Sequence, residues 1–274
     1  MGKVFLIDVK QCNGCYNCQI VCKDEHCDND WRPYAAPQPQ TGHFWMKMRE
    51  KVRGQVPWVR VAYQPVMCQH CEKCPVLELG EADGSVYRRE DGLVVIDPEK
   101  AKGRADIAEK FEGVFWNAEL NIPQGCTGCA HLLDDGWTVP RCVDACAVGG
   151  LRFGDEADFA DEVANAEKLD PKSSVYYLNL PKRWVAGQVV DPMADEVIIG
   201  ATVTMQEEGN PEAEVLKTTT DEFGDFWFRQ VEGRKYHLWF EADGYVAREI
   251  ADVDATETDA NIGRVGLYKM IPLG

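Results

Sequence analysis

The second half of the chain, from Trp184 onward, shows a regular alternation of apolar and polar positions. Six short segments there are rich in β-branched and aromatic residues, and Gly, Pro, Asn or Asp separate them, as in strands joined by turns. They are residues 184–191, 200–207, 214–221, 225–231, 235–242 and 264–270. The alternation indicates one buried face per strand. Residues 184–274 are therefore predicted to form an antiparallel β-sandwich or small barrel of about seven strands.

The first half of the chain, residues 1–183, is irregular and rich in loops, Pro and Gly. Its last part, residues 155–171, is acidic and helix-prone, which predicts a connector on the surface. The pattern as a whole predicts an α+β protein. A loop-rich domain over 1–183 is followed by a strand domain over 184–274.

Composition and charge narrow the class of protein. The chain has 274 residues, 45% of them hydrophobic, which is ordinary for a soluble globular protein. It contains no apolar run long enough for a membrane span and no signal peptide, so no membrane association is expected. The net charge of −17 argues against nucleic acid as a partner, because binding to phosphates needs a basic face. We interpret the acidity of the strand domain as a solvated face.

Twelve cysteines change the interpretation of the first half. They are Cys12, Cys15, Cys18, Cys22, Cys27, Cys68, Cys71, Cys74, Cys126, Cys129, Cys142 and Cys146. Disulfide frameworks usually belong to small secreted domains. This chain is long, lacks a secretion signal and spaces its cysteines two or three residues apart. Metal binding is therefore the favoured interpretation.

The first motif, C12NGC15YNC18QIVC22, indicates an iron–sulfur cluster. Three thiolates on one short loop can hold three corners of a [4Fe–4S] cube, and the fourth cysteine starts a helix and ligates the other cluster of a pair. Its partner motif contains Cys126, Cys129, Cys142 and Cys146. Alone, that motif could also be a zinc ribbon. Together, the motifs predict a ferredoxin-like unit with crossed ligation. One cluster takes Cys12, Cys15, Cys18 and Cys146, and a second takes Cys22, Cys126, Cys129 and Cys142.

The middle motif, Cys68, Cys71 and Cys74 followed by Pro75, gives three ligands for a third cluster. Where a crossed cysteine is expected stands Glu78. The phrases CNGCYNCQIVCKDE, MCQHCEKCP, REDGLVVIDPEK and CTGCAHLLDDGWTVPRCVDAC lie within residues 3–154. With them, the chain resembles the iron–sulfur subunits of the molybdopterin oxidoreductase (dimethyl sulfoxide reductase) family.

The resemblance implies an electron-transfer subunit without catalytic residues, docked on a large catalytic chain that alone carries molybdenum and molybdopterin guanine dinucleotide. In the family, a further CxxCxxCxxxC motif follows DPEK. Here Ala101, Arg104, Ile107 and Phe111 stand at those positions. One family member with three clusters and an appended strand domain is cytoplasmic, and we expect the same of this chain. Three cubes need twelve ligands, so counting nominates Cys27 as the fourth ligand beside Cys68, Cys71 and Cys74. The alternative is a free thiol at Cys27, with Asp106, Glu109 or water as the ligand.

The strand domain has its own resemblance. GQVVDPMADEVIIGATVTMQ, TTTDEFGDFWF and YHLWFEADGY are similar to a transthyretin-like or carboxypeptidase-regulatory β-sandwich. That resemblance implies a binding or docking module without chemistry of its own. Two functions stay open: the electron-transfer subunit described above, and a free-standing multi-cluster ferredoxin whose strand domain binds a partner transiently. Free ferredoxins are usually far shorter.

Overall fold

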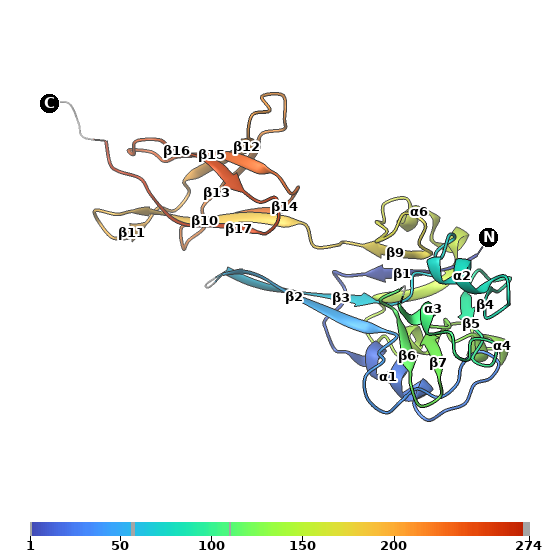
Figure 1. Ribbon diagram of the computed structural model, residues 1–274. Coiled ribbons are helices and arrows are strands. Elements are labelled where there is room, and N and C mark those ends of the chain that lie inside the picture. Colours follow the sequence, from blue (N-terminus) through green and yellow to red (C-terminus); the bar gives the residue numbers. More distant parts are fainter. Residues whose placement is uncertain (1, 56–57, 110, 271–274) are drawn as a thin grey trace. The chain divides into compact units, whose positions relative to one another are not determined.

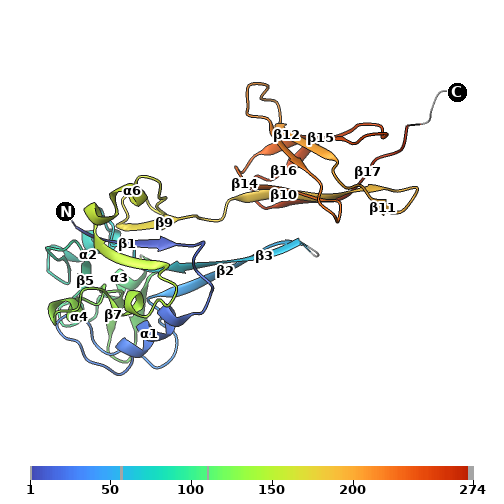
Figure 2. The same ribbon diagram turned by 180° about the vertical axis from the view of Figure 1, so that it is seen from behind.

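The computed structural model describes residues 2–55, 58–109 and 111–270 (Figures 1 and 2). The chain divides into two compact units. The first consists of residues 1–50 and 63–180, and the second of residues 51–62 and 181–274. The predicted boundary at 183/184 lies close to this division. The assignment of residues 51–62 to the first domain differs from it. Among the helices that the described residues form, none is long and apolar enough to cross a membrane.

The first unit is organised around the N-terminal strand. β1 (Lys3–Asp8) lies between β8 (Leu151–Asp155), which is antiparallel to it, and β9 (Val175–Leu178), which is parallel. Figure 2 shows β1 and β9 side by side. The side chains of Phe5 and Ile7 are almost fully buried in a core that also contains Cys18, Cys22 and Cys142. The sheet therefore forms one wall of the cysteine-rich region.

Three hairpins and several short helices complete this region. The hairpins are β2 (Lys47–Gln55) with β3 (Trp58–Val66), β4 (Val86–Arg88) with β5 (Val94–Ile96), and β6 (Val114–Asn117) with β7 (Ile122–Gly125). The helices are α1 (Asn17–His26), α2 (Pro75–Gly80), α3 (Ala105–Glu109), α4 (Ala130–Asp134) and α5 (Arg141–Asp144). Most helices are short because cysteine loops and turns interrupt them.

The acidic segment 155–171 contains less helix than its composition predicts. It forms a 3-10 turn, η1 (Glu156–Phe159), and one helical turn, α6 (Ala160–Val163). Four acidic residues fall in the first turns of these two elements, and like charges one turn apart destabilise a longer helix.

The second unit is a β-sandwich of two sheets, as predicted, and its layers are visible in Figure 1. One sheet contains β10 (Arg183–Asp191), β11 (Glu196–Val197), β14 (Asp225–Val231) and β17 (Ala260–Gly266). The other contains β12 (Thr202–Glu207), β13 (Leu216–Thr219), β15 (Lys235–Glu241) and β16 (Arg248–Asp254). Val185, Val203, Met205, Leu238 and Phe240 are fully buried between them. Alternate positions of β12 and β15 enter this core, which explains the sequence pattern.

The sandwich departs from the prediction in two respects. It is not purely antiparallel, since β17 runs parallel to β10. A Cβ atom at Gly187 of β10 would lie 2.8 Å from Ile262 and 2.9 Å from the carbonyl oxygen of Gly263, so only glycine allows this close approach. The sequence pattern also missed β16. Most of its residues are exposed, so it shows no apolar alternation.

A buried ion pair joins residue 53 to the rest of the second unit. The Arg53 and Asp259 side chains are only 8% and 5% exposed, and Arg53 Nε donates to Asp259 Oδ2 at 2.9 Å. The same guanidinium donates to the carbonyl oxygen of Lys182, and Asp259 also accepts from the Trp184 backbone. Arg53 of β2 therefore belongs to this unit because its guanidinium neutralises a buried carboxylate.

Candidate iron–sulfur sites

One small cavity is lined by Cys12, Cys15, Cys18 and Cys146, among other residues. These are the four cysteines that the sequence groups in the first predicted cluster. Burial is the main cause that raises the pKa of Cys18 to about 11, and the neighbouring Cys12 and Cys146 thiols raise it further. Thiolates crowded in this way need a cation for compensation, and a metal centre supplies one. The donor set therefore fits a cluster.

Contacts beside the cysteines bring the first motif and Cys146 together. Asn17, which begins α1, donates from Nδ2 to the Ala145 carbonyl oxygen at 2.6 Å. On the other side, Asp8 at the end of β1 donates its backbone N–H to the Gly150 carbonyl oxygen at 2.8 Å. A Cβ atom at Gly150 would lie 3.5 Å from the backbone nitrogen of Cys12. The loop after α5 therefore sits directly against the first cysteine loop.

A second, more deeply buried group contains Cys22, Cys126, Cys129 and Cys142. Burial first and the Cys129 thiol second raise the pKa of Cys22 to about 12. Burial and Cys22 raise the pKa of Cys126 to about 12. The pKa of Cys142 is raised well above its usual value by burial and then by Cys129, Cys22 and Cys126. Cys22 thus lies among cysteines of the partner motif, as crossed ligation requires, although it shares α1 with Cys18.

The third group contains Cys68, Cys71 and Cys74. Burial raises the pKa of Cys68, and Cys126, Cys74 and Cys71 add to the effect. An arginine that the motif analysis missed organises this loop. Arg88 donates to the carbonyl oxygens of Gly92 at 2.7 Å and Glu72 at 3.0 Å, and also to that of Cys71. It directly precedes the family phrase REDGLVVIDPEK, and that position was the available signal.

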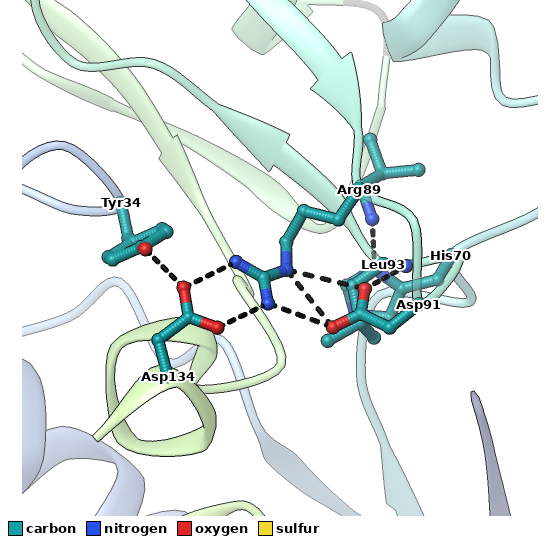
Figure 3. Close-up of polar contacts among 7 residues, drawn as sticks. Tyr34, His70, Arg89, Asp91, Leu93 and Asp134 are labelled. Carbon is teal, nitrogen blue, oxygen red and sulfur yellow. Dashed lines mark hydrogen bonds and ion pairs between the residues drawn. The ribbon is translucent and has the colours of Figure 1, made fainter. Parts of the chain in front are cut away.

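A network of side-chain hydrogen bonds connects the β4–β5 hairpin, which contains Arg88, to α4 (Figure 3). Arg89 lies between the carboxylates of Asp91 and Asp134, and Tyr34 donates to Asp134. His70, next to Cys71, is fully buried and accepts from the Val94 backbone at Nδ1 over 3.1 Å. The network connects the loop of the third cysteine group with the helix that follows Cys129.

The family's further cysteine motif is degenerate here, with Ala101, Arg104, Ile107 and Phe111 at the cysteine positions. Apolar side chains occupy most of these positions in this degenerate motif. Ala101 and Ile107 are fully buried and pack in one cluster with Cys71 and Cys74. Arg104 turns to polar partners. It donates to Asp106 at 2.9 Å, to the Leu79 carbonyl oxygen at 2.9 Å and to Asp83. Glu78 and Glu109 are exposed. Residues 101–109 therefore form packed structure, with no thiolate among them.

Cys27 lies half-buried at the end of α1. Its backbone N–H donates to the Lys23 carbonyl oxygen, and it forms an isolated bridge with Gln38. The apolar cluster that contains Cys71 and Cys74 does not include it. In residues 2–55, 58–109 and 111–270, no group of three or more His, Cys, Asp or Glu side chains is arranged to hold a single metal ion.

A unit with three cysteine groups followed by a cysteine-free sandwich defines an iron–sulfur protein of the multi-cluster class. The 4Fe-4S dicluster domain family matches residues 59–156, and the carboxypeptidase regulatory-like domain family matches residues 185–265. The pyrogallol hydroxytransferase small subunit of Pelobacter acidigallici is 36% identical over 270 residues, 93% of this chain and 96% of the relative. The chain therefore belongs to the family of pyrogallol hydroxytransferase small subunits, among the iron–sulfur subunits of molybdopterin oxidoreductases.

More distant relatives match about two thirds of the chain or less. A tetrathionate reductase subunit of Salmonella typhimurium is 27% identical, over 66% of this chain and 73% of the relative. The thiosulfate reductase electron transfer subunit of Salmonella typhi is 28% identical, over 60% of this chain and 82% of the relative. These relatives support the prediction of an iron–sulfur electron-transfer subunit.

Proposed function

We propose that this chain carries three [4Fe–4S] clusters and transfers electrons as the small subunit of a heterodimeric molybdopterin enzyme. The observation that carries the proposal is the cavity lined by Cys12, Cys15, Cys18 and Cys146. Such a group of thiols from distant parts of the chain is what a ferredoxin-type cluster requires. The second cluster takes Cys22, Cys126, Cys129 and Cys142. The third takes Cys68, Cys71 and Cys74, and counting alone nominates Cys27 as its fourth ligand.

The three cysteine groups are neighbours in a row. Cys18 of the first group is among the thiols that raise the pKa of Cys142 in the second. Cys126 of the second group likewise raises the pKa of Cys68 in the third. Clusters bound there supply one-electron transfer, and this order leads an electron from the first group through the second to the third. Cys15 is exposed, so the first group is also accessible from the surface.

The partner is a large catalytic subunit that holds molybdenum and molybdopterin guanine dinucleotide. The small subunit of pyrogallol hydroxytransferase, which aligns along nearly the whole chain, supports this assignment. The complete enzyme then transfers a hydroxyl group between trihydroxybenzenes, as pyrogallol–phloroglucinol transhydroxylase, on the large subunit. In this proposal the present chain contributes no catalytic residue and works in the cytoplasm without contact to membranes or nucleic acid.

The second unit, a transthyretin-like sandwich in this proposal, serves as a docking module. Its match to the carboxypeptidase regulatory-like family covers residues 185–265, which contain no cysteine and so no thiolate for a cluster. Its buried residues are almost all apolar and serve its core.

Purification of the tagged chain from its native host, under anoxic conditions, tests the proposal. We expect one large molybdenum-containing chain to co-elute at a fixed ratio, together with about twelve irons per small chain. Elution of the small chain alone, with its clusters intact, would favour the free-standing ferredoxin. About sixteen irons per small chain would contradict the loss of the fourth cluster.

A further inference from the structure

The segment that carries Asp170 is fastened along the loop of the third cysteine group. The Glu72 backbone N–H donates to the Lys172 carbonyl oxygen at 2.8 Å, and the Ser174 N–H donates to the Gln69 carbonyl oxygen at 2.9 Å. Two serine hydroxyls donate further hydrogen bonds from this segment to the cysteine loop. Ser173 donates to the Gln69 side chain at 2.9 Å, and Ser174 donates to the His70 carbonyl oxygen at 3.1 Å. The position of Asp170 is therefore fixed relative to Cys68 and Cys71.

Asp170 reaches the place where the family has its missing ligand. A groove is lined by Asp170, by Met67 and Gln69 on both sides of Cys68, and by Phe111, among other residues. Phe111 stands at the position of the crossed cysteine in the family motif, and its ring cannot bind iron. One groove thus contains the residues flanking a ligand of the third group, the position that lost its thiolate and a carboxylate.

The carboxylate of Asp170 is oriented and partly available. Its Oδ1 accepts from the Lys172 backbone N–H at 2.8 Å, and Oδ2 has no hydrogen bond among the described residues. Asp170 also lies two residues before Lys172, whose carbonyl oxygen accepts from the backbone N–H of Glu72, the residue that follows Cys71. A carboxylate and a thiolate brought together without a cation repel each other, and an iron centre between them removes that repulsion.

We propose that Asp170 is the fourth ligand of the third cluster, beside Cys68, Cys71 and Cys74, and that Cys27 is a free thiol. The inference rests on the third cluster of the proposed function. It replaces the assignment from counting with one from position. The contacts of Cys27 lead to Lys23 and Gln38, whereas residues 172–174, directly after Asp170, are hydrogen-bonded to the loop of the third group. One iron of the protein then has an oxygen ligand, and all the others have cysteine sulfur.

The test compares iron content and Mössbauer spectra of the anoxically purified heterodimer with four variants of the small subunit. In the unaltered protein, about one iron in twelve should have the spectrum of an oxygen-ligated site. Asp170→Ala should lower the iron content to about eleven, or to about eight when the whole cluster is lost, and Asp170→Cys should restore about twelve, all sulfur-ligated. Cys27→Ser and the matched control Asp161→Ala, an acidic residue of the same connector, should leave both readouts unchanged.

Loss of iron in Cys27→Ser, with full iron in Asp170→Ala, would overturn the inference and keep the three-cluster protein. Full iron in both variants would also overturn it, because neither residue would then be a ligand. About eight irons in the unaltered protein would instead remove the third cluster, and with it that part of the proposed function.

Discussion

The guanidinium of Arg89 holds both carboxylate oxygens of Asp134. Nη1 lies 2.9 Å from Oδ2, and Nη2 lies 2.7 Å from Oδ1. Arg89 follows β4 and Asp134 ends α4, so the pair connects the hairpin beside the third cysteine group with the helix beside the second. Paired N–H donors of this kind fix direction as well as distance.

Asp134→Asn should destabilise the protein modestly, by about 0.5–1 kcal/mol, because the carboxylate is partly exposed and solvent screens it. The hydrogen bonds from Arg89, then that from Tyr34, lower the pKa of Asp134 to about 2. Its contribution is therefore complete above the usual carboxyl pKa near 4 and is lost as pH falls toward 2. Anoxic thermal unfolding at several pH values checks this. The difference between wild type and variant should stay constant from about pH 8 to pH 5. A difference that shrinks within that range, or an equal effect of the neighbouring exposed Asp135→Asn, would contradict the prediction.

Cys22→Ser should damage a cluster whose other ligands lie more than a hundred residues away. Cys22 shares α1 with Cys18 but lies among Cys126, Cys129 and Cys142. Paramagnetic resonance of the reduced protein should lose the signal of that cluster and keep that of Cys12, Cys15 and Cys18. Cys15→Ser is the matched control and should give the opposite result. If Cys22→Ser instead removed only the signal of the first group, the crossed assignment would be wrong.

Ile107→Ala should lower the free energy of unfolding by about 2–5 kcal/mol, because it opens a void in fully buried packing. The iron content should stay unchanged, since Ile107 holds no metal. Chemical denaturation under anoxic conditions measures the first effect, and iron analysis the second. Glu78→Gln, at the exposed position of the other lost ligand, should change stability by less than about 0.5 kcal/mol. A neutral Ile107→Ala would show that the degenerate motif is not tightly packed.

Asp259→Asn should have opposite consequences in two contexts. In the full chain, it leaves the buried Arg53 guanidinium without its counter-ion and should cost about 3–5 kcal/mol. In a fragment of residues 181–274, which lacks Arg53, the same substitution removes an unpaired buried carboxylate and should be neutral or stabilising. The fragment itself should be soluble and rich in strand by circular dichroism. Equal destabilisation of the full chain and of the fragment would contradict the assignment of Arg53 as the partner of Asp259.

Much of the site is predictable because cluster ligation imposes short, fixed spacings between cysteines. The motifs therefore indicated which thiols gather, and Cys146 does line one cavity with Cys12. Asp170 carries no such signal. It lies in an acidic segment where it resembles any solvated carboxylate, and only the hydrogen bonds of residues 172–174 place this segment beside the loop of Cys71.

In the fold, a segment could be predicted where its burial leaves a regular pattern in the sequence, and it could not be predicted elsewhere. Strands with one buried face, such as β12 and β15, show alternation and were predicted. β16 is held by hydrogen bonds to β15 while most of its side chains are exposed, so its sequence has no period. Likewise, residues 51–62 join the second unit through long-range contacts such as those of Arg53 with Asp259 and of Arg60 with the Trp227 ring, and such contacts leave no pattern in the chain.

β1 lies between β8 and β9, so this strand leaves the ribosome long before either of its partners is made. At ~5–20 residues per second, synthesis from β1 as far as β9 takes roughly 10–35 s. Cys146, the fourth cysteine of the first group, is added only late in that interval. The first cluster can therefore be completed only after Cys146 has been synthesised. The topology of one three-stranded sheet thus sets when, in the life of the polypeptide, its iron can arrive.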